Sequence, residues 1–318
     1  MILLSFPAAK VLFIVLGITT GILSAWFWLQ LFGRGSSVFH VVVAIVLFLG
    51  SWPFVLALRV HQPALIVFAL MTGALMAIAA RRPWVGGVLL AFATIKPQSV
   101  IGIVGWLLLW SLSSWKDRKG ILISFALTLS AMLSAAELLV PGWFWEWREA
   151  LSAYMSYAPL PGAYVELMFG NQLGKVVGAL VVFTIFLFCW KARRDAPDTN
   201  RFKLAPALIL SANLFISPVW HAYDHIFLLP SAILLWEWRE QFFQLKPFQR
   251  GILRFSALAL IWQWFAVAVA VGIVMIAPSL ALNLRILPYF SVLLLPPLAL
   301  ASLILVGRAR LSRSVGPT

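Results

Sequence analysis

Lys96 is the residue whose type and position point most directly to chemistry. It is the only charged residue in the apolar stretch 84–113, and a lysine inside a membrane segment marks a candidate functional site. Pro97 disfavours helical dihedrals at Lys96 and frees a carbonyl one turn earlier, so the helix should break there. A new helix would open at Pro97, Gln98 and Ser99, and its N-terminus with the lysine would attract an anion. The alternative is a lysine that snorkels to the surface.

A second polar cluster, residues 217–225, follows an apolar run. Asp224 lies near His221 and His225, and the three side chains would share one face of a helix that follows Pro218. A carboxylate in this setting can act as a general base or hold a cation that accompanies a phosphate. Two histidines and one carboxylate can also bind a transition metal. The plainer interpretation is a hydrated cap at the membrane boundary. We expect no resident metal and take Asp224 as the candidate catalytic residue.

The composition indicates a membrane protein. The 318 residues are 63% hydrophobic and 11% charged, and the repeated apolar runs approach the length of a membrane span. The net charge of +14 could indicate a nucleic-acid partner. The basic residues lie at the ends of apolar runs, however, where they orient helices in the bilayer. We therefore expect membrane lipids, and not nucleic acid, as partners. The single cysteine, Cys189, excludes an intrachain disulfide.

The apolar runs predict an all-α integral membrane protein, a polytopic bundle of about 9–11 transmembrane or re-entrant helices. One multi-pass domain would cover residues 1–318, with a basic cytoplasmic tail at 307–318. The runs are 11–32, 38–58, 64–80, 85–95, 100–112, 121–140, 176–190, 204–216, 226–238, 255–277 and 287–306. The basic clusters, which the positive-inside rule places in the cytoplasm, are 81–82, 116–119, 191–194, 201–203, 239–254 and 308–313.

Residues 84–113 could form either a hairpin or one long helix. One helix would be roughly 45 Å long, against a hydrocarbon core of about 30 Å. Both ends of the stretch, at 81–82 and 116–119, are basic and favour the cytoplasm. A hairpin broken at Lys96-Pro97 satisfies both ends and places its turn inside the membrane, opening outward. Backbone at that depth must line a protein or water cavity. A long tilted helix is the alternative.

Residues 141–173 form the longest external stretch, an aromatic loop. Tryptophans at 143, 145 and 147 alternate with charged residues, which predicts an amphipathic helix at the membrane interface. Segment 170–175 resembles a phosphate-binding loop only faintly, because it lacks the full spacing and the preceding strand. We interpret it as a cap for the following helix, with Asn171 or Gln172 contacting a sugar.

Several short motifs occur in a characteristic order along the chain. They are Gln62, Arg81-Arg82, Gly86-Gly87, Lys96-Pro97-Gln98, Asn171-Gln172-Leu173, Ser217-Pro218-Val219-Trp220, Tyr223-Asp224 and Leu228-Leu229-Pro230. Together, over about residues 4–238, they resemble glycosyltransferase family 87, a group of integral-membrane enzymes of the GT-C type.

The resemblance implies transfer of a hexose, typically mannose, from a polyprenyl-phosphate carrier. The acceptor would be a glycan or glycolipid on the outer face of the cell (plasma or inner) membrane, and no cofactor is expected. Lys96 would contact the phosphate of the carrier. The substrate-binding residues that the motifs suggest are Lys96, Pro97, Gln98, Asn171, Gln172, Trp220, His221, Tyr223 and His225, with Asp224 lining the same outward cavity.

GT-C enzymes usually carry a catalytic aspartate in a first external loop, and the printed chain has no such loop. The resemblance therefore predicts a further helix and loop before Met1, and activity of this chain alone would depend on them. Two other functions fit the same features: a transporter or flippase of an anionic lipid or solute, and a truncated non-catalytic scaffold. Lys96→Met should weaken carrier binding without lowering stability, since a membrane charge is removed.

Overall fold

The computed structural model describes residues 5–33, 37–157, 162–218, 221–277, 279 and 287–313. All regular structure in these ranges is helical, which confirms the all-α fold predicted from the sequence. The elements are α1 (Phe6–Phe32), α2 (Val38–Leu49), α3 (Trp52–Arg59), α4 (Ala64–Ala79), α5 (Pro83–Ala93), α6 (Pro97–Leu112), α7 (Trp115–Leu139), α8 (Trp143–Tyr157), α9 (Tyr164–Phe169), α10 (Asn171–Ala192), α11 (Asn200–Ile216), η1 (Ala222–Leu228), α12 (Leu229–Glu237), η2 (Arg239–Gln244), α13 (Pro247–Ile276), η4 (Leu287–Ser291) and α15 (Leu295–Arg313).

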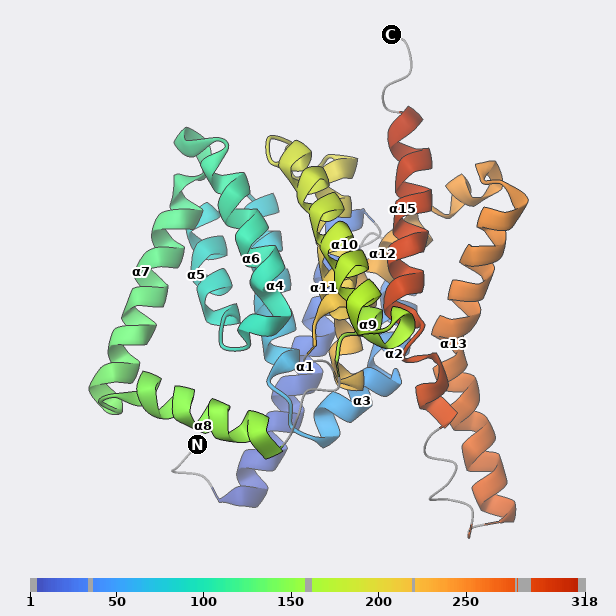
Figure 1. Cartoon of the computed structure of the whole chain (residues 1–318), viewed down its shortest axis with the longest axis horizontal. Coiled ribbons are helices and arrows are strands. Elements are labelled where there is room, and N and C mark those ends of the chain that lie inside the picture. The colour runs from blue at the N-terminus through green and yellow to red at the C-terminus, as the bar shows by residue number, and fades with distance from the viewer. Residues whose placement is uncertain are drawn as a thin grey trace.

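Within the described ranges, five helices are long and apolar enough to cross a membrane: α1, α7, α10, α13 and α15. The pair α2–α3, bent by 55°, makes a sixth span when the two helices are taken together, and α4, α5 and α6 are shorter apolar helices. The ends of the helices that carry the basic clusters lie together at the top of Figure 1, whereas α8 and the start of α1 lie at the opposite end. This is the distribution of charge that the positive-inside rule requires.

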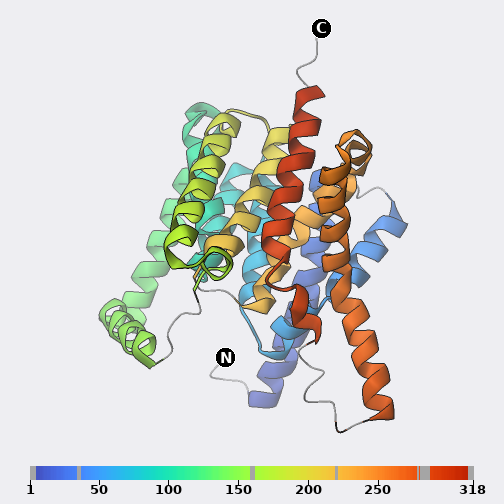
Figure 2. The same cartoon turned by 45° about the vertical axis from the view of Figure 1, so that its right-hand side comes forward.

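The stretch 84–113 forms a hairpin, as predicted, and the alternative of one long helix is wrong. The helices α5 and α6 run antiparallel in both views (Figures 1 and 2), and both basic ends lie on the same side of the bundle. Pro97 is the first residue of α6, and Lys96 before it has non-helical dihedrals of φ −127° and ψ 74°. The break arises where proline and its predecessor cannot continue a helix.

Two glycines fix the position of the hairpin. A Cβ on Gly86 would lie 2.8 Å from Ile78 Cγ1 of α4. A Cβ on Gly87 would overlap Ser124 Oγ and the carbonyl oxygen of Ile121, both on α7. Small residues of this kind let membrane helices approach closely. The hairpin is thereby held between α4 and α7, and the break at its tip is positioned with it.

An aromatic cluster holds η1 inside the bundle. Phe227 of η1 meets Phe68 of α4 edge to face, with ring centroids 5.2 Å apart at an interplanar angle of 82°. Phe48 of α2 packs on Phe68 and on Phe54 of α3, and all four rings are buried. Such rings bury a large apolar area and prefer this geometry. The cluster therefore fixes the short segment that carries Asp224.

Three boundaries differ from the sequence prediction. The run 287–306 divides into η4 and α15, because the prolines at 296 and 297 are tolerated only in the first turn of a helix. The external stretch 141–173 contains two helices, α8 and α9, and α10 already begins at Asn171. The first of them, α8, lies crosswise to the spans (Figure 1), as expected of an interfacial helix. The predicted tail 307–318 overlaps α15 as far as Arg313.

Candidate active site

The break between α5 and α6 brings Lys96 to Asp224 of η1, 128 residues later in the chain. Lys96 Nζ donates a hydrogen bond to Asp224 Oδ1 at 2.5 Å, and the two side chains are only 10% and 6% exposed. The lysine therefore does not snorkel to the surface. The sequence predicted Lys96 at a turn inside the membrane that opens outward, and the resemblance placed Asp224 in the same outward cavity. The structure brings the two residues together as one buried ion pair.

The surroundings of the pair orient both charges. The ring of Tyr223 lies 4.9 Å from Lys96 Nζ, within reach of a cation–π interaction. His221 stacks on Tyr223 with centroids 4.8 Å apart and an interplanar angle of 6°. The backbone N–H of His221 donates to Asp224 Oδ2 at 3.1 Å. Both carboxylate oxygens thus have a donor, which fixes the orientation of the aspartate.

His225 does not share a face with His221 and Asp224, so that prediction is wrong. Segment η1 is a 3₁₀ helix with about three residues per turn; His221 and Asp224 are therefore one turn apart while His225 points elsewhere. Its Nε2 lies 2.9 Å from the hydroxyl oxygen of Tyr164, and its Nδ1 is buried without a partner among the described residues. Segment η1 is not one of the helices long enough to cross a membrane. Burial lowers the pKa of the His225 imidazole, which keeps the ring neutral.

A metal arrangement of two histidines and one carboxylate does not form here. His221 Nδ1 lies 4.0 Å from Asp224 Oδ2, and the His225 ring is bound to Tyr164 instead. Across the described ranges, no three His, Cys, Asp or Glu side chains are placed to hold an ion together. The aspartate is available to the lysine and to a bound substrate.

A small pocket opens beside the pair, and part of its wall comes from the start of α6. Pro97 and Gln98 are exposed, and Asn213 Nδ2 of α11 donates to the Gln98 carbonyl oxygen at 2.9 Å. The residues lining the pocket are Gln98, Ser99, Asn213, Leu214, Ser217, Asp224 and Phe227. A ligand in this pocket would reach the carboxylate of Asp224 directly.

Other predicted site residues lie apart from the pair. Asn171 and Gln172 are exposed in the first turn of α10, and in the described part of the chain neither side chain forms a hydrogen bond with Lys96 or Asp224. Trp220 lies outside the described residues.

Sequence reasoning missed Tyr164 and Asn213. Asn213 carries a usable signal, since it is a polar side chain inside the apolar run 204–216. Tyr164 carries none: it is one aromatic residue in an aromatic loop, and its fully buried hydroxyl meets His225 only through the tertiary fold.

The arrangement joins a cation, a carboxylate and the N-terminus of a helix at one pocket. An anionic group could bind Lys96 with help from the dipole of α6. A carboxylate at the same place could accept a proton from a hydroxyl group.

Comparison with known proteins gives one match. A family model described as glycosyltransferase family 87 matches residues 1–218. The match includes Lys96 and ends before Asp224. No curated protein and no solved structure matches the chain.

Proposed function

The chain belongs to glycosyltransferase family 87, whose model matches residues 1–218, and from this membership we propose a specific reaction. The protein transfers a hexose, with mannose as the expected sugar, from a polyprenyl-phosphate carrier. The acceptor is a glycan or glycolipid at the outer face of the cell membrane. Family membership favours an enzyme over the transporter and scaffold alternatives.

The buried ion pair is the observation that carries this proposal. Without a ligand, Lys96 is neutralised by Asp224 at 2.5 Å, because an unpaired buried charge is costly. The phosphodiester of the sugar donor bears one negative charge, as a carboxylate does, but its two unesterified oxygens can accept hydrogen bonds from Lys96 and from the amides that begin α6. It can therefore replace Asp224 as the partner of Lys96. The exchange leaves the carboxylate free to accept a proton, so that binding of the donor prepares the base.

Once the Lys96–Asp224 pair has separated, both side chains can act in the reaction. The acceptor hydroxyl oxygen attacks the anomeric carbon of the sugar and forms the new glycosidic bond. The bond between that carbon and the phosphate oxygen breaks, and the electron pair leaves with the polyprenyl phosphate. Asp224 takes the proton of the hydroxyl group. Lys96 and the N-terminus of α6 stabilise the charge on the departing phosphate.

Several of the other predicted residues are assigned to substrate binding. The pocket lined by Gln98, Asn213 and Asp224 has a volume of about 10 Å³, enough for one water-sized group, so we place the attacking hydroxyl group of the acceptor there. The exposed ring of His221, stacked on the buried Tyr223, offers a flat surface beside it. The exposed Asn171 and Gln172 can contact the sugar from the start of α10.

Asp224→Asn tests the assignment of the base. The variant keeps the size of the side chain and removes the proton acceptor. Turnover with polyprenyl-phosphate mannose should fall by roughly 10²–10⁴-fold, the usual contribution of general base catalysis. Asp198→Asn, at an exposed aspartate, is the matched control and should retain full turnover. Normal turnover of Asp224→Asn would remove Asp224 from the chemistry.

A further inference from the structure

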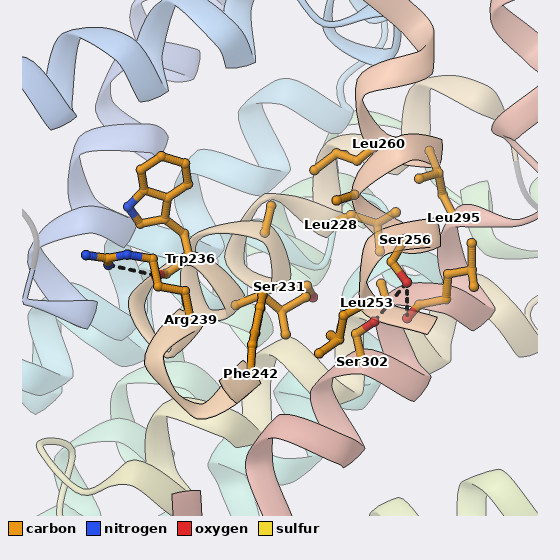
Figure 3. Close-up of a pocket in the computed structure, with 15 residues that line it drawn as sticks. Leu228, Ser231, Trp236, Arg239, Phe242, Leu253, Ser256, Leu260, Leu295 and Ser302 are labelled. Carbon is orange, nitrogen blue, oxygen red and sulfur yellow. Dashed lines mark hydrogen bonds between the residues drawn. The ribbon is translucent and has the colours of Figure 1, made fainter. Parts of the chain in front are cut away.

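A second cavity lies apart from the ion pair, between α12 and η2 on one side and α13 and α15 on the other (Figure 3). Its volume is about 330 Å³. All the residues that line it lie beyond 218, where the family match ends. None of the residues proposed above to act on the sugar or the phosphate lines it. It is therefore a separate site.

The walls of this cavity are suited to a hydrocarbon. Leucine side chains from α12, α13 and α15 line it, among them Leu235, Leu260 and Leu298. The hydroxyl groups in the wall are already satisfied by the protein: Ser256 Oγ lies 2.9 Å from Ser302 Oγ, as Figure 3 shows. Apart from Arg239 at one end, the serine hydroxyls of the wall are paired with protein atoms, and apolar walls of this kind accept apolar molecules. An acyl chain from the bilayer meets this requirement.

One end of the cavity is positively charged. Arg239 lines it, and its guanidinium donates to the Trp236 carbonyl oxygen at 3.2 Å and lies 6.0 Å from the Trp236 ring. Among the described residues, no carboxylate forms an ion pair with Arg239. A guanidinium group has five N–H donors and binds phosphate in a bidentate manner. Most of the hydrogen-bond donors of Arg239 are therefore available to a ligand.

The neighbourhood of Arg239 adds charge of the same sign. Lys246, Arg250 and Arg254 follow it, against Glu237 and Glu240. This end of the bundle carries the basic clusters (Figure 1), and the positive-inside rule places it at the cytoplasmic leaflet. Anionic lipids of that leaflet are attracted to such basic segments.

We propose that this cavity binds an anionic glycerophospholipid, with one acyl chain between α12, α13 and α15 and the phosphate on Arg239. The cavity also reaches Leu228, the last residue of η1. An acyl chain there packs against the segment that holds Asp224. The bound lipid thus supports the position of the ion pair from the opposite side of the bundle.

Native mass spectrometry of the whole chain tests this site, with phosphatidylglycerol, phosphatidylcholine and undecaprenyl phosphate as competing probes. Wild-type protein should retain one phosphatidylglycerol in preference to phosphatidylcholine. Arg239→Gln should weaken phosphatidylglycerol binding about five-fold, as for one lost contact between a basic residue and an anionic surface, and leave phosphatidylcholine unchanged. Arg82→Gln, at the same end of the bundle, is the matched control and should behave as wild type.

A cavity-filling variant tests the acyl-chain part of the site. Ala299→Phe places a ring in the wall and should reduce retention of both phospholipids. Since Arg239 is exposed, its variant should fold even where Ala299→Phe does not. Three results would overturn the proposal: equal retention of the two phospholipids by wild type, unchanged phosphatidylglycerol binding in Arg239→Gln, or displacement of phosphatidylglycerol by undecaprenyl phosphate, which would make the cavity a site for the carrier chain.

Discussion

Replacing Lys96 by methionine should destabilise the protein, which reverses the expectation from sequence alone. The sequence shows a costly charge in an apolar run, whose removal should be harmless. The structure shows that this charge neutralises Asp224, whose side chain is only 6% exposed. Lys96→Met therefore leaves a buried carboxylate without its cation.

The size of the effect follows from the burial of the pair. Removing one partner of a buried ion pair typically costs about 3–5 kcal/mol. Asp224 keeps the hydrogen bond from the His221 N–H, so we expect the lower end, about 3 kcal/mol, or a fall in melting temperature of about 6 °C. Adding Asp224→Asn removes the stranded charge. The double variant should recover most of the loss, with a coupling free energy of about 2 kcal/mol or more.

Thermal melting of the four proteins in one detergent measures this cycle. Arg201→Met is the control, because Arg201 pairs with Asp195 at 3.1 Å but has a side chain that is 48% exposed. That substitution should cost less than about 1 kcal/mol. The reasoning would be refuted if Lys96→Met melted like wild type, or if the double variant melted below both single variants.

Three further predictions concern the elements that position the pair. Gly87→Leu should prevent recovery of folded protein, because the new side chain would overlap α7. Gly105→Leu, where a Cβ meets nothing within 4 Å, should express normally, and equal yields of the two variants would contradict this packing. Tyr164→Phe removes the buried hydroxyl bound to an imidazole of η1 and should lower the free energy of unfolding by about 1–3 kcal/mol; an unchanged melting curve would make that contact unimportant. Single cysteines at 82 and 116, in a Cys189→Ser background, should react with a membrane-impermeant reagent from the same side, and labelling from opposite sides would disprove the hairpin.

The hairpin could be predicted because its signals are local. Pro97 breaks the helix whatever surrounds it, and the basic residues at both ends of 84–113 restrict the topology. The apolar composition likewise predicted the all-α class. These features depend on backbone chemistry and on the bilayer, so a single sequence is sufficient to find them.

The ion pair and η1 could not be predicted from the sequence. Segment η1 was expected to be an α-helix, and the packing of Phe227 on Phe68 accompanies the tighter 3₁₀ form that turns His225 away from Asp224. The distance between Lys96 and Asp224 depends on how closely Gly86 and Gly87 let α5 approach its neighbours. Such contacts join residues far apart in the chain, and neither a periodicity nor a motif in the sequence predicts them.

Binding of polyprenyl phosphate to purified protein tests the central claim, that Lys96 exchanges Asp224 for the phosphate of the carrier. Asp224→Asn removes the competing carboxylate, so it should bind the carrier at least as tightly as wild type. The double variant Lys96→Met/Asp224→Asn has no stranded charge and should remain folded, yet it should bind roughly ten- to hundred-fold more weakly, because a charge-assisted contact worth about 1.5–3 kcal/mol is lost. Wild-type affinity in a folded double variant would show that Lys96 does not hold the phosphate, and would contradict the account.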